Sequence, residues 1–107
     1  MLNRNDDDIQ ELIDGNTHVI VQFSASWCGP CKVLKPKVDK ISFENSDIVF
    51  AYIDLETGEQ FSQKMKVQAV PTVIGFHNSK VVETLIGPSD SAVKSLVENL
   101  RSRVNND

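Results

Sequence analysis

Two runs of the chain are mainly apolar. They are "HVIVQFS" at residues 18–24 and "DIVFAYID" at residues 47–54, and both are rich in β-branched side chains. Neither run alternates cleanly between apolar and polar positions. Such runs are typical of strands that are covered on both faces of a sheet. We therefore expect two central, buried strands.

Three other segments show helical spacing, at residues 6–14, 29–44 and 89–104. In each of them the apolar residues recur three or four positions apart, so that they form one stripe along a helix. Pro36 lies inside the second segment, where it removes a backbone donor and predicts a kink. The sequence thus predicts three amphipathic helices that pack against the sheet.

Residues with capping side chains flank the first and the last of these helices. Asn5 or Asp6 can serve as the N-cap of the first helix, and Ser89 or Asp90 as the N-cap of the last. Gly15 follows the first helix, where a C-cap in the left-handed conformation is expected. These positions set the predicted helix boundaries.

A short helix and a hairpin complete the pattern. Thr57 and Gln60 have the spacing of a capping box, which predicts a helix that begins near Glu59. The apolar runs at 71–76 and 80–86 are separated by only three residues, which favours an antiparallel hairpin.

The order of these elements predicts an α/β fold in a single domain that spans residues 1–107. The first strand–helix–strand passage is expected to form a right-handed parallel pair. We expect a mixed central sheet of four to five strands with helices on both faces. Whether residues 1–4 add the fifth strand is left open.

Composition and charge narrow the possible functions. The 107 residues include 11 basic and 15 acidic side chains, for a net charge of -4. An acidic domain is a poor candidate for binding nucleic acid, and no apolar run is long enough to cross a membrane. The four lysines between Lys32 and Lys40 are the one local excess of positive charge, and helical spacing favours a solvated helix face for them. The N-terminal residues lack a signal or transit peptide pattern, so we expect a cytoplasmic protein.

The two cysteines of the chain, Cys28 and Cys31, lie three positions apart between a strand and a helix. A zinc site needs four ligands, and the two histidines, His18 and His77, do not have metal-ligand spacing to the cysteines. A structural disulfide stabilises chiefly by closing a long loop, and this pair closes almost none. Two inert buried thiols fit poorly with a strand-to-helix turn that we expect to be exposed.

A reactive dithiol explains the spacing better. Cys28 falls at the start of a helix, where free backbone N–H groups and the helix dipole stabilise a thiolate. Cys31 lies one turn later and is expected to point inward. We therefore predict that Cys28 is the nucleophile and Cys31 the resolving thiol, with Gly29 and Pro30 shaping the turn.

The segment "WCGPCK" at residues 27–32 resembles the active site of the thioredoxin family. The resemblance covers almost the whole chain. "AVPT" at residues 69–72 is similar to the family's loop with a cis-proline, which would be Pro71. Pro36 and Gly87 match the proline of the active-site helix and the glycine after the last strand.

Membership of this family would imply general protein-disulfide reduction without a bound cofactor. The dithiol would be restored by an NADPH-dependent flavoprotein, thioredoxin reductase, and the partners would be disulfide-containing proteins. We expect a monomer. The resemblance also implies a docking groove, in which the backbone of Val70 would pair with an extended substrate segment. The implied groove residues are Trp27, Gly29, Pro30, Val70, Pro71 and Gly87.

Gln22 departs from the family pattern. Six positions before the first cysteine, most members have a buried aspartate, and the lysine that often accompanies it would fall at Phe50 here. A carboxylate can take the proton of the resolving thiol, whereas an amide can only orient a water or hydrogen-bond the thiol. Gln22 is therefore a candidate for modulating the second step, and a buried amide kept for packing is the equally weighted alternative.

Two other activities compete with reduction. A scaffold of the same fold could bind partners through the groove without turnover, but the intact Cys28–Cys31 pair favours an enzyme. An oxidase or isomerase of a secretory compartment is disfavoured by Gly29-Pro30 between the cysteines and by the N-terminal sequence.

Overall fold

The structure, a computed structural model, describes residues 1–103 and contains one five-stranded mixed sheet with four helices. This agrees with the α/β fold that the sequence predicts. In chain order, the elements are β1 (Leu2–Arg4), α1 (Ile9–Asp14), β2 (His18–Ser24), α2 (Gly29–Glu44), β3 (Val49–Asp54), α3 (Glu59–Lys64), β4 (Thr72–His77), β5 (Lys80–Ile86) and α4 (Asp90–Arg101).

The strand order in the sheet is β1-β3-β2-β4-β5. The pairs β1–β3 and β2–β3 are parallel, and β2–β4 and β4–β5 are antiparallel. The expected parallel pair around α2 and the expected hairpin are both confirmed. The sequence left open whether residues 1–4 add a fifth strand. Residues 2–4 do form this strand, which pairs with β3 so that Asn3 aligns with Tyr52.

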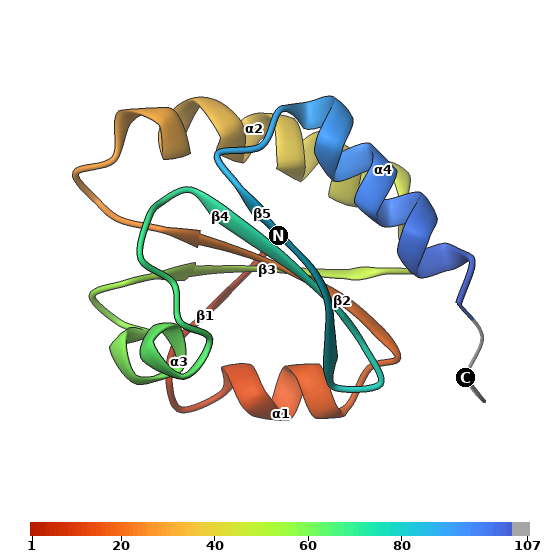
Figure 1. Ribbon diagram of the computed structural model, residues 1–107, viewed down its shortest axis with the longest axis horizontal. Helices are drawn as coiled ribbons and strands as arrows, with labels where there is room; N and C mark the ends of the chain where they lie inside the picture. The colour runs from red at the N-terminus through yellow and green to blue at the C-terminus, as the bar shows by residue number, and fades with distance from the viewer. Residues whose placement is uncertain (104–107) are drawn as a thin grey trace.

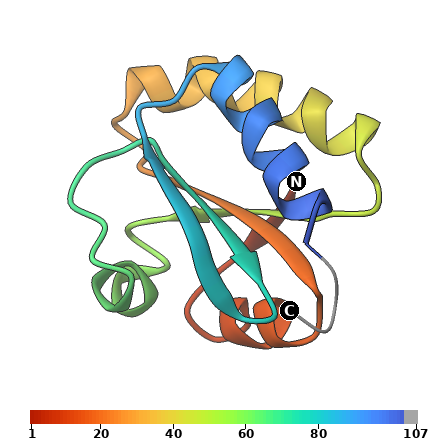
Figure 2. The same ribbon diagram turned by 45° about the vertical axis from the view of Figure 1, so that its right-hand side comes forward.

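Helices cover both faces of the sheet. Figures 1 and 2 show α2 and α4 above it and α1 and α3 below it. Successive residues of β2 point to opposite faces, so Ile20 joins the core under α2 and α4 while Val21 and Phe23 join the core above α1 and α3. The continuous apolar run of β2 is thus explained by burial on both sides.

The helix α4 lies very close to β4. A Cβ atom built on Gly75 would lie 2.7 Å from Leu96 Cδ1, so the absence of a side chain at Gly75 allows this approach. Ser89 is the N-cap of α4, as expected, and its Oγ accepts a hydrogen bond from the Ala92 backbone N–H at 3.2 Å. The predicted last helix extended to residue 104, which lies outside the described residues; α4 ends at Arg101.

The first helix begins at Ile9, three residues later than predicted. Asp6 was expected to cap or open this helix, but its carboxylate instead accepts hydrogen bonds from the backbone N–H groups of Gln60 and Phe61, at 3.1 and 2.8 Å. Asp6 therefore caps α3. The predicted left-handed C-cap at Gly15 is also wrong, since its φ is -86°.

The cap of α3 differs from the predicted capping box. Its N-cap residue is Gly58, and the Thr57 hydroxyl donates to the Asp54 carbonyl at 3.4 Å instead of accepting from the helix. The start of the helix at Glu59 is confirmed. The distant Asp6 carboxylate takes the place that local residues were expected to fill.

The two strands at the margins of the sheet are irregular or short. β1 has three residues. β5 pairs with β4 through a register shift between Gly75 and Phe76. Among residues 1–103, none of the helices combines the length and the apolar character that crossing a bilayer demands.

Candidate active site

The cysteines lie where β2 ends and α2 begins. Cys28 is the N-cap of α2, with extended backbone angles (φ -90°, ψ 105°), and Pro30 is in the first turn, where its missing N–H is not needed. Cys31 follows one turn into the helix. The two cysteines form a disulfide, with Cα atoms 5.3 Å apart.

The start of α2 offers a backbone donor to the first sulfur. The Cys31 backbone N–H donates a hydrogen bond to Cys28 Sγ at 3.1 Å. No acidic side chain lies in the first turn of this 16-residue helix. The positive end of the helix dipole and this N–H are therefore arranged to stabilise negative charge on Cys28 Sγ when the disulfide opens.

The exposure of Cys28 corrects an expectation from the sequence. The turn itself is exposed, and 74% of Trp27 is accessible, but only 3% of Cys28 is, against 0% of Cys31. Cys28 is buried because neighbouring apolar side chains pack around the disulfide. These neighbours are Ala25, Leu55 and Val70.

A carboxylate on the β3–α3 connection anchors the turn before the cysteines. Glu56 Oε1 accepts hydrogen bonds from the Ser26 backbone N–H at 3.2 Å and from Ser26 Oγ at 2.9 Å. The pKa of Glu56 is lowered by hydrogen bonds from its own backbone N–H and from Ser26. The sequence carries no local signal for this contact, since the two residues are 30 positions apart.

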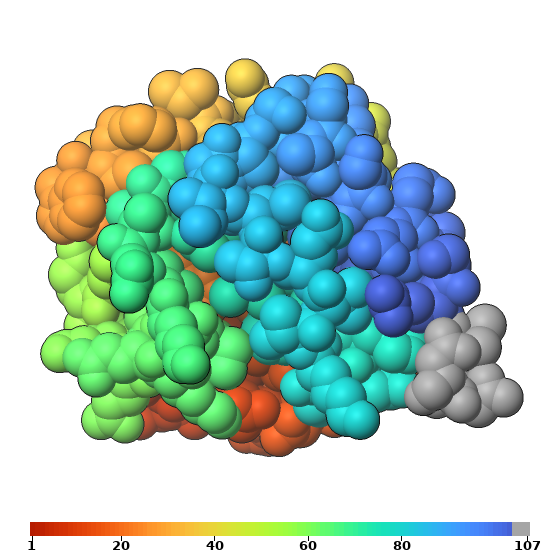
Figure 3. Space-filling view, viewed as in Figure 1, coloured from red at the N-terminus to blue at the C-terminus, as the bar shows by residue number. Residues whose placement is uncertain are grey.

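An apolar groove of about 360 Å³ opens beside the turn. It lies between the start of α2, the loop before β4 and the β5–α4 connection, which Figure 2 shows close together and Figure 3 shows at the surface. The structure thus brings together three of the residues proposed for docking. The lining residues are Pro30, Val33, Leu34, Lys37, Pro71, Gly87, Pro88, Ser89 and Asp90.

The other three candidate docking residues lie around the turn rather than in this groove. Trp27 and Gly29 are exposed on the turn, and Val70 packs against the disulfide. The Val70–Pro71 peptide bond is cis, as expected. The backbone N–H of Gly87 donates to the Pro71 carbonyl at 2.8 Å, and Gly87 has φ +57°, a conformation that favours glycine.

Gln22 is fully buried in the middle of β2. It alternates with Val21 and Phe23, so its side chain points to the α2 side of the sheet, the side on which Ile20 packs. Neither amide atom of Gln22 has a hydrogen-bond partner among residues 1–103. Phe50, also buried, belongs to the apolar core on that side.

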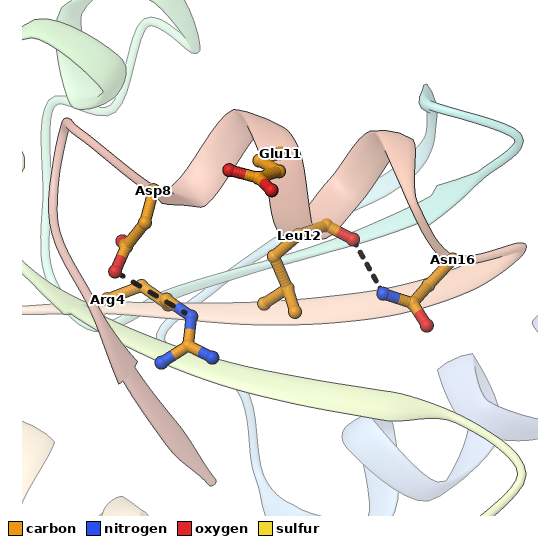
Figure 4. Close-up of a pocket in the computed structure, with 5 residues that line it drawn as sticks. All are labelled: Arg4, Asp8, Glu11, Leu12 and Asn16. Atoms are coloured by element: carbon orange, nitrogen blue, oxygen red, sulfur yellow. Dashed lines mark hydrogen bonds and ion pairs between the residues drawn. The ribbon is translucent and has the colours of Figure 1, made fainter.

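A second hollow, of about 440 Å³, lies against α1 and is lined by polar groups (Figure 4). Arg4 and Asp8 form an ion pair across it at 3.9 Å, and Asn16 Nδ2 donates to the Leu12 carbonyl at 2.8 Å. Arg4 is thus paired with Asp8 and Asn16 with Leu12, and neither cysteine lines this hollow. In the described part of the chain, no three histidine, cysteine or acidic side chains cluster as metal ligands would.

The sequence and the structure were compared with known proteins. The family model described as Thioredoxin matches residues 1–101. A thioredoxin of Echinococcus granulosus is 32% identical over 92 residues, which cover 86% of each chain. A mitochondrial thioredoxin of Bos taurus is 35% identical over 80 residues, 74% of this chain and 48% of that protein. The solution structure of the oxidised thioredoxin of Plasmodium falciparum superimposes with a TM-score of 0.86 at 32% identity, over 92% of this chain and 96% of that one.

Proposed function

The chain belongs to the thioredoxin family and is a thiol–disulfide oxidoreductase, and from this premise we propose that Cys28 is its nucleophile and Cys31 its resolving thiol. The observation that carries the assignment is the position of Cys28 Sγ, which accepts a hydrogen bond from the Cys31 N–H at the start of α2. Cys31 has no comparable place at the helix terminus.

In the first step, the Cys28 thiolate attacks one sulfur of a substrate disulfide. A bond forms between Cys28 Sγ and that sulfur, the substrate S–S bond breaks, and the other substrate sulfur leaves as a thiolate and takes a proton. The backbone N–H of Cys31 stabilises the Cys28 thiolate before the attack. The product of this step is a mixed disulfide.

In the second step, the Cys31 thiolate attacks Cys28 Sγ, the bond between Cys28 Sγ and the substrate sulfur breaks, and that sulfur leaves as a thiolate and takes a proton. The Cα–Cα separation of 5.3 Å in the disulfide is within the usual range for proteins. The substrate disulfide gains two electrons, and the Cys28–Cys31 pair loses them.

We further propose that Gln22 modulates this second step. A buried amide without a protein partner is suited to hold a water or to hydrogen-bond the Cys31 thiol, but it cannot accept a proton as a carboxylate does. Proton removal from Cys31 then depends on solvent or on the leaving substrate thiolate.

Substrate docking is assigned to the surface around Cys28. The groove offers apolar walls to a substrate side chain. Val70 precedes β4, which begins at Thr72, so its backbone groups take no part in the sheet and can pair with an extended segment. The proposed docking residues are Trp27, Gly29, Pro30, Val70, Pro71 and Gly87.

Disulfide-containing proteins are the substrates, as family membership implies. We propose that an NADPH-dependent flavoprotein, thioredoxin reductase, restores the dithiol, and that the protein acts as a cytoplasmic monomer without a bound cofactor.

Insulin reduction followed by turbidity, together with cysteine variants, tests this function. The wild type should precipitate insulin faster than dithiothreitol alone, and Cys28→Ser should abolish the acceleration. Cys31→Ser should instead accumulate a stable mixed disulfide through Cys28, detectable by mass spectrometry. A scaffold without turnover would give no precipitation above the dithiothreitol control.

Alkylation separates the roles of the two thiols. In the reduced protein, iodoacetamide should modify Cys28 much faster than Cys31, because the thiolate is stabilised at Cys28. Equal rates at both sulfurs would contradict the assignment.

A further inference from the structure

The helix α2 carries unpaired positive charge in an otherwise acidic protein. It contains four lysines and two acidic residues, whereas the rest of the chain has seven basic and thirteen acidic residues. Lys35 is paired with Asp39 at 3.2 Å. Among residues 1–103, Lys32, Lys37 and Lys40 have neither an ion pair nor a side-chain hydrogen bond.

Apolar side chains lie between these three lysines. Val33 is 62% exposed, Phe43 is 92% exposed, and Pro36 is also exposed. The spacing of three or four residues places them on the same outward side of the helix. We call this surface the lysine face; its residues are Lys32, Val33, Pro36, Lys37, Lys40 and Phe43.

The lysine face differs from an ordinary solvated helix face. A solvated face commonly alternates charges of opposite sign, which pair along the helix. Here three lysines outnumber one exposed acidic residue, Glu44, and large apolar groups are exposed among them. This combination is complementary to a partner surface that carries acidic side chains together with apolar ones.

The lysine face begins at the reacting thiols. Lys32 directly follows Cys31, and both Val33 and Lys37 also line the groove beside Pro30. In Figures 1 and 2, α2 extends along the top of the molecule, with its outer side away from the sheet. A helix of 16 residues is about 24 Å long. A protein whose disulfide reaches Cys28 from this side therefore lies over the lysine face.

We propose that the lysine face docks an acidic, partly apolar surface next to the reacting disulfide of protein substrates. This proposal rests on the proposed function and adds a substrate preference to it. Asp90 lines the groove together with Lys37, so the groove itself has charges of both signs. The preference for acidic partners therefore arises on the outer side of α2.

The expected effect is on association. Like-signed charges that face an oppositely charged partner accelerate encounter, and the acceleration decreases as salt shortens the screening length to a few ångströms. The rest of this acidic protein repels an acidic partner, so the lysine face also selects the orientation in which the partner's disulfide meets Cys28.

Three synthetic peptides test the proposal. They share one intramolecular disulfide and differ only in flanking residues, which are glutamate, serine or lysine. The wild-type protein should reduce the glutamate peptide about three- to ten-fold faster than the lysine peptide at low salt, measured as kcat/KM, and the ratio should approach one at high salt.

Two double variants with the same change in net charge provide the control. Lys37→Gln/Lys40→Gln should lose most of the preference for the glutamate peptide. Lys64→Gln/Lys80→Gln, which changes lysines on α3 and β5, should retain it. Equal rates for the three peptides with the wild type, or an equal loss in both double variants, would overturn the proposal.

Binding without turnover separates this proposal from the proposed function. The oxidised protein is titrated with a glutamate peptide in which serines replace the cysteines, and backbone amide shifts are recorded. Shifts confined to α2 residues, abolished in Lys37→Gln/Lys40→Gln, would support the docking even if no peptide were reduced. Shifts elsewhere, or association with anionic lipid vesicles without a peptide preference, would contradict it.

Discussion

At the scale of single residues, the reactivity of the site depends on a donor that belongs to the backbone. The N–H of Cys31 contacts Cys28 Sγ, and neither its presence nor its direction depends on the side chain at position 31. The position of this donor follows from the N-cap role of Cys28, which the sequence predicts from the strand-to-helix transition. The burial of Cys28 does not follow from the motif, because it is produced by Leu55 and Val70 from distant segments.

Both members of the charged pair that is common in the family are replaced by uncharged residues here. Phe50 takes the position of the lysine that often accompanies the acid in the family, so the core under α2 buries neither charge. The cost is an amide whose two polar atoms have no protein partner in the described residues. The sequence identifies Gln22 by its departure from the family pattern, but only the sheet register shows which face it occupies.

Gln22→Asp should lower stability and accelerate resolution. A carboxylate in this apolar layer loses hydration, so its pKa rises in the folded state, and ionisation should cost about 1–3 kcal/mol of unfolding free energy. Since the native state then binds the proton more tightly, the loss is absent below the unfolded pKa and grows as pH increases toward the folded pKa. A base near Cys31 should accelerate release of the substrate thiol at and above neutral pH.

Urea denaturation across pH and single-turnover resolution rates measure these two effects. Gln22→Asn is the matched control, because it has the same size as aspartate and cannot ionise. If Gln22→Asp is as stable as the control at pH 8 and resolves the mixed disulfide no faster, residue 22 does not act on Cys31.

At the scale of elements, local sequence patterns correctly predicted those helices and strands whose positions depend on local interactions. The apolar run of β2, the proline-initiated α2 and the closely spaced β4–β5 pair have the expected positions. The position of the site was therefore predicted as well, because its turn joins β2 to α2 and its groove lies between α2 and the segment before β4.

The misplaced start of α1 has a long-range cause. Asp6 has the sequence signature of a local cap, yet its carboxylate caps α3, more than 50 residues away in the chain. The same contact explains why Thr57 and Gln60 do not form a capping box. A pattern within one segment contains no information on such a tertiary bond.

Asp6→Ala should therefore destabilise the protein through α3. It removes both acceptors for the backbone N–H groups of Gln60 and Phe61, and loss of a cap costs about 1–2 kcal/mol. Hydrogen exchange of α3 amides and urea denaturation measure the effect. Asp7→Ala, a change of equal charge on an exposed neighbour, is the control, and an equal loss in both variants would contradict the role of Asp6.

At the scale of the whole molecule, two apolar cores share the central strand. Ile20 belongs to the core under α2 and α4, and Val21 belongs to the core next to α1 and α3. Because β2 contributes to both, neither core can be lost without the other. We propose that the chain is one cooperative domain.

Coincident unfolding transitions would support this proposal. Trp27, the one tryptophan, lies on the active-site turn, and its fluorescence reports on that turn, whereas far-UV circular dichroism reports on all helices and strands. Both probes should give the same midpoint in urea. A separate early transition of the fluorescence would indicate that the turn unfolds independently.

The opposite end of the sheet should make stability depend on pH. His18 and His77 are cross-strand neighbours whose ring centroids lie 5.0 Å apart. Burial lowers the pKa of His18 most, and repulsion from His77 lowers it next. A hydrogen bond to the Arg103 carbonyl and the charge of Asp47 act in the opposite direction, and Arg101 lowers the pKa slightly further. The unfolded state therefore binds the proton more readily, so stability present above the usual histidine pKa of about 6.5 is lost as pH falls toward the folded value.

Thermal or urea unfolding between pH 7.5 and pH 5 measures this loss. His18→Gln should unfold with a shallower pH dependence than the wild type over this range. An unchanged slope would show that His18 titrates alike in the folded and unfolded states.

The margins of the sheet bear on how the protein behaves when it is abundant. An exposed edge strand is a template on which other chains can add strands, and such growth leads to fibrils. β1 offers only three residues for such growth, and β5 pairs irregularly with β4 and exposes the charged Lys80 and Glu83. Strand addition at β1 is therefore limited to three residues, and on β5 the charges of Lys80 and Glu83 have to offset the exposed apolar side chains of Val81 and Ile86.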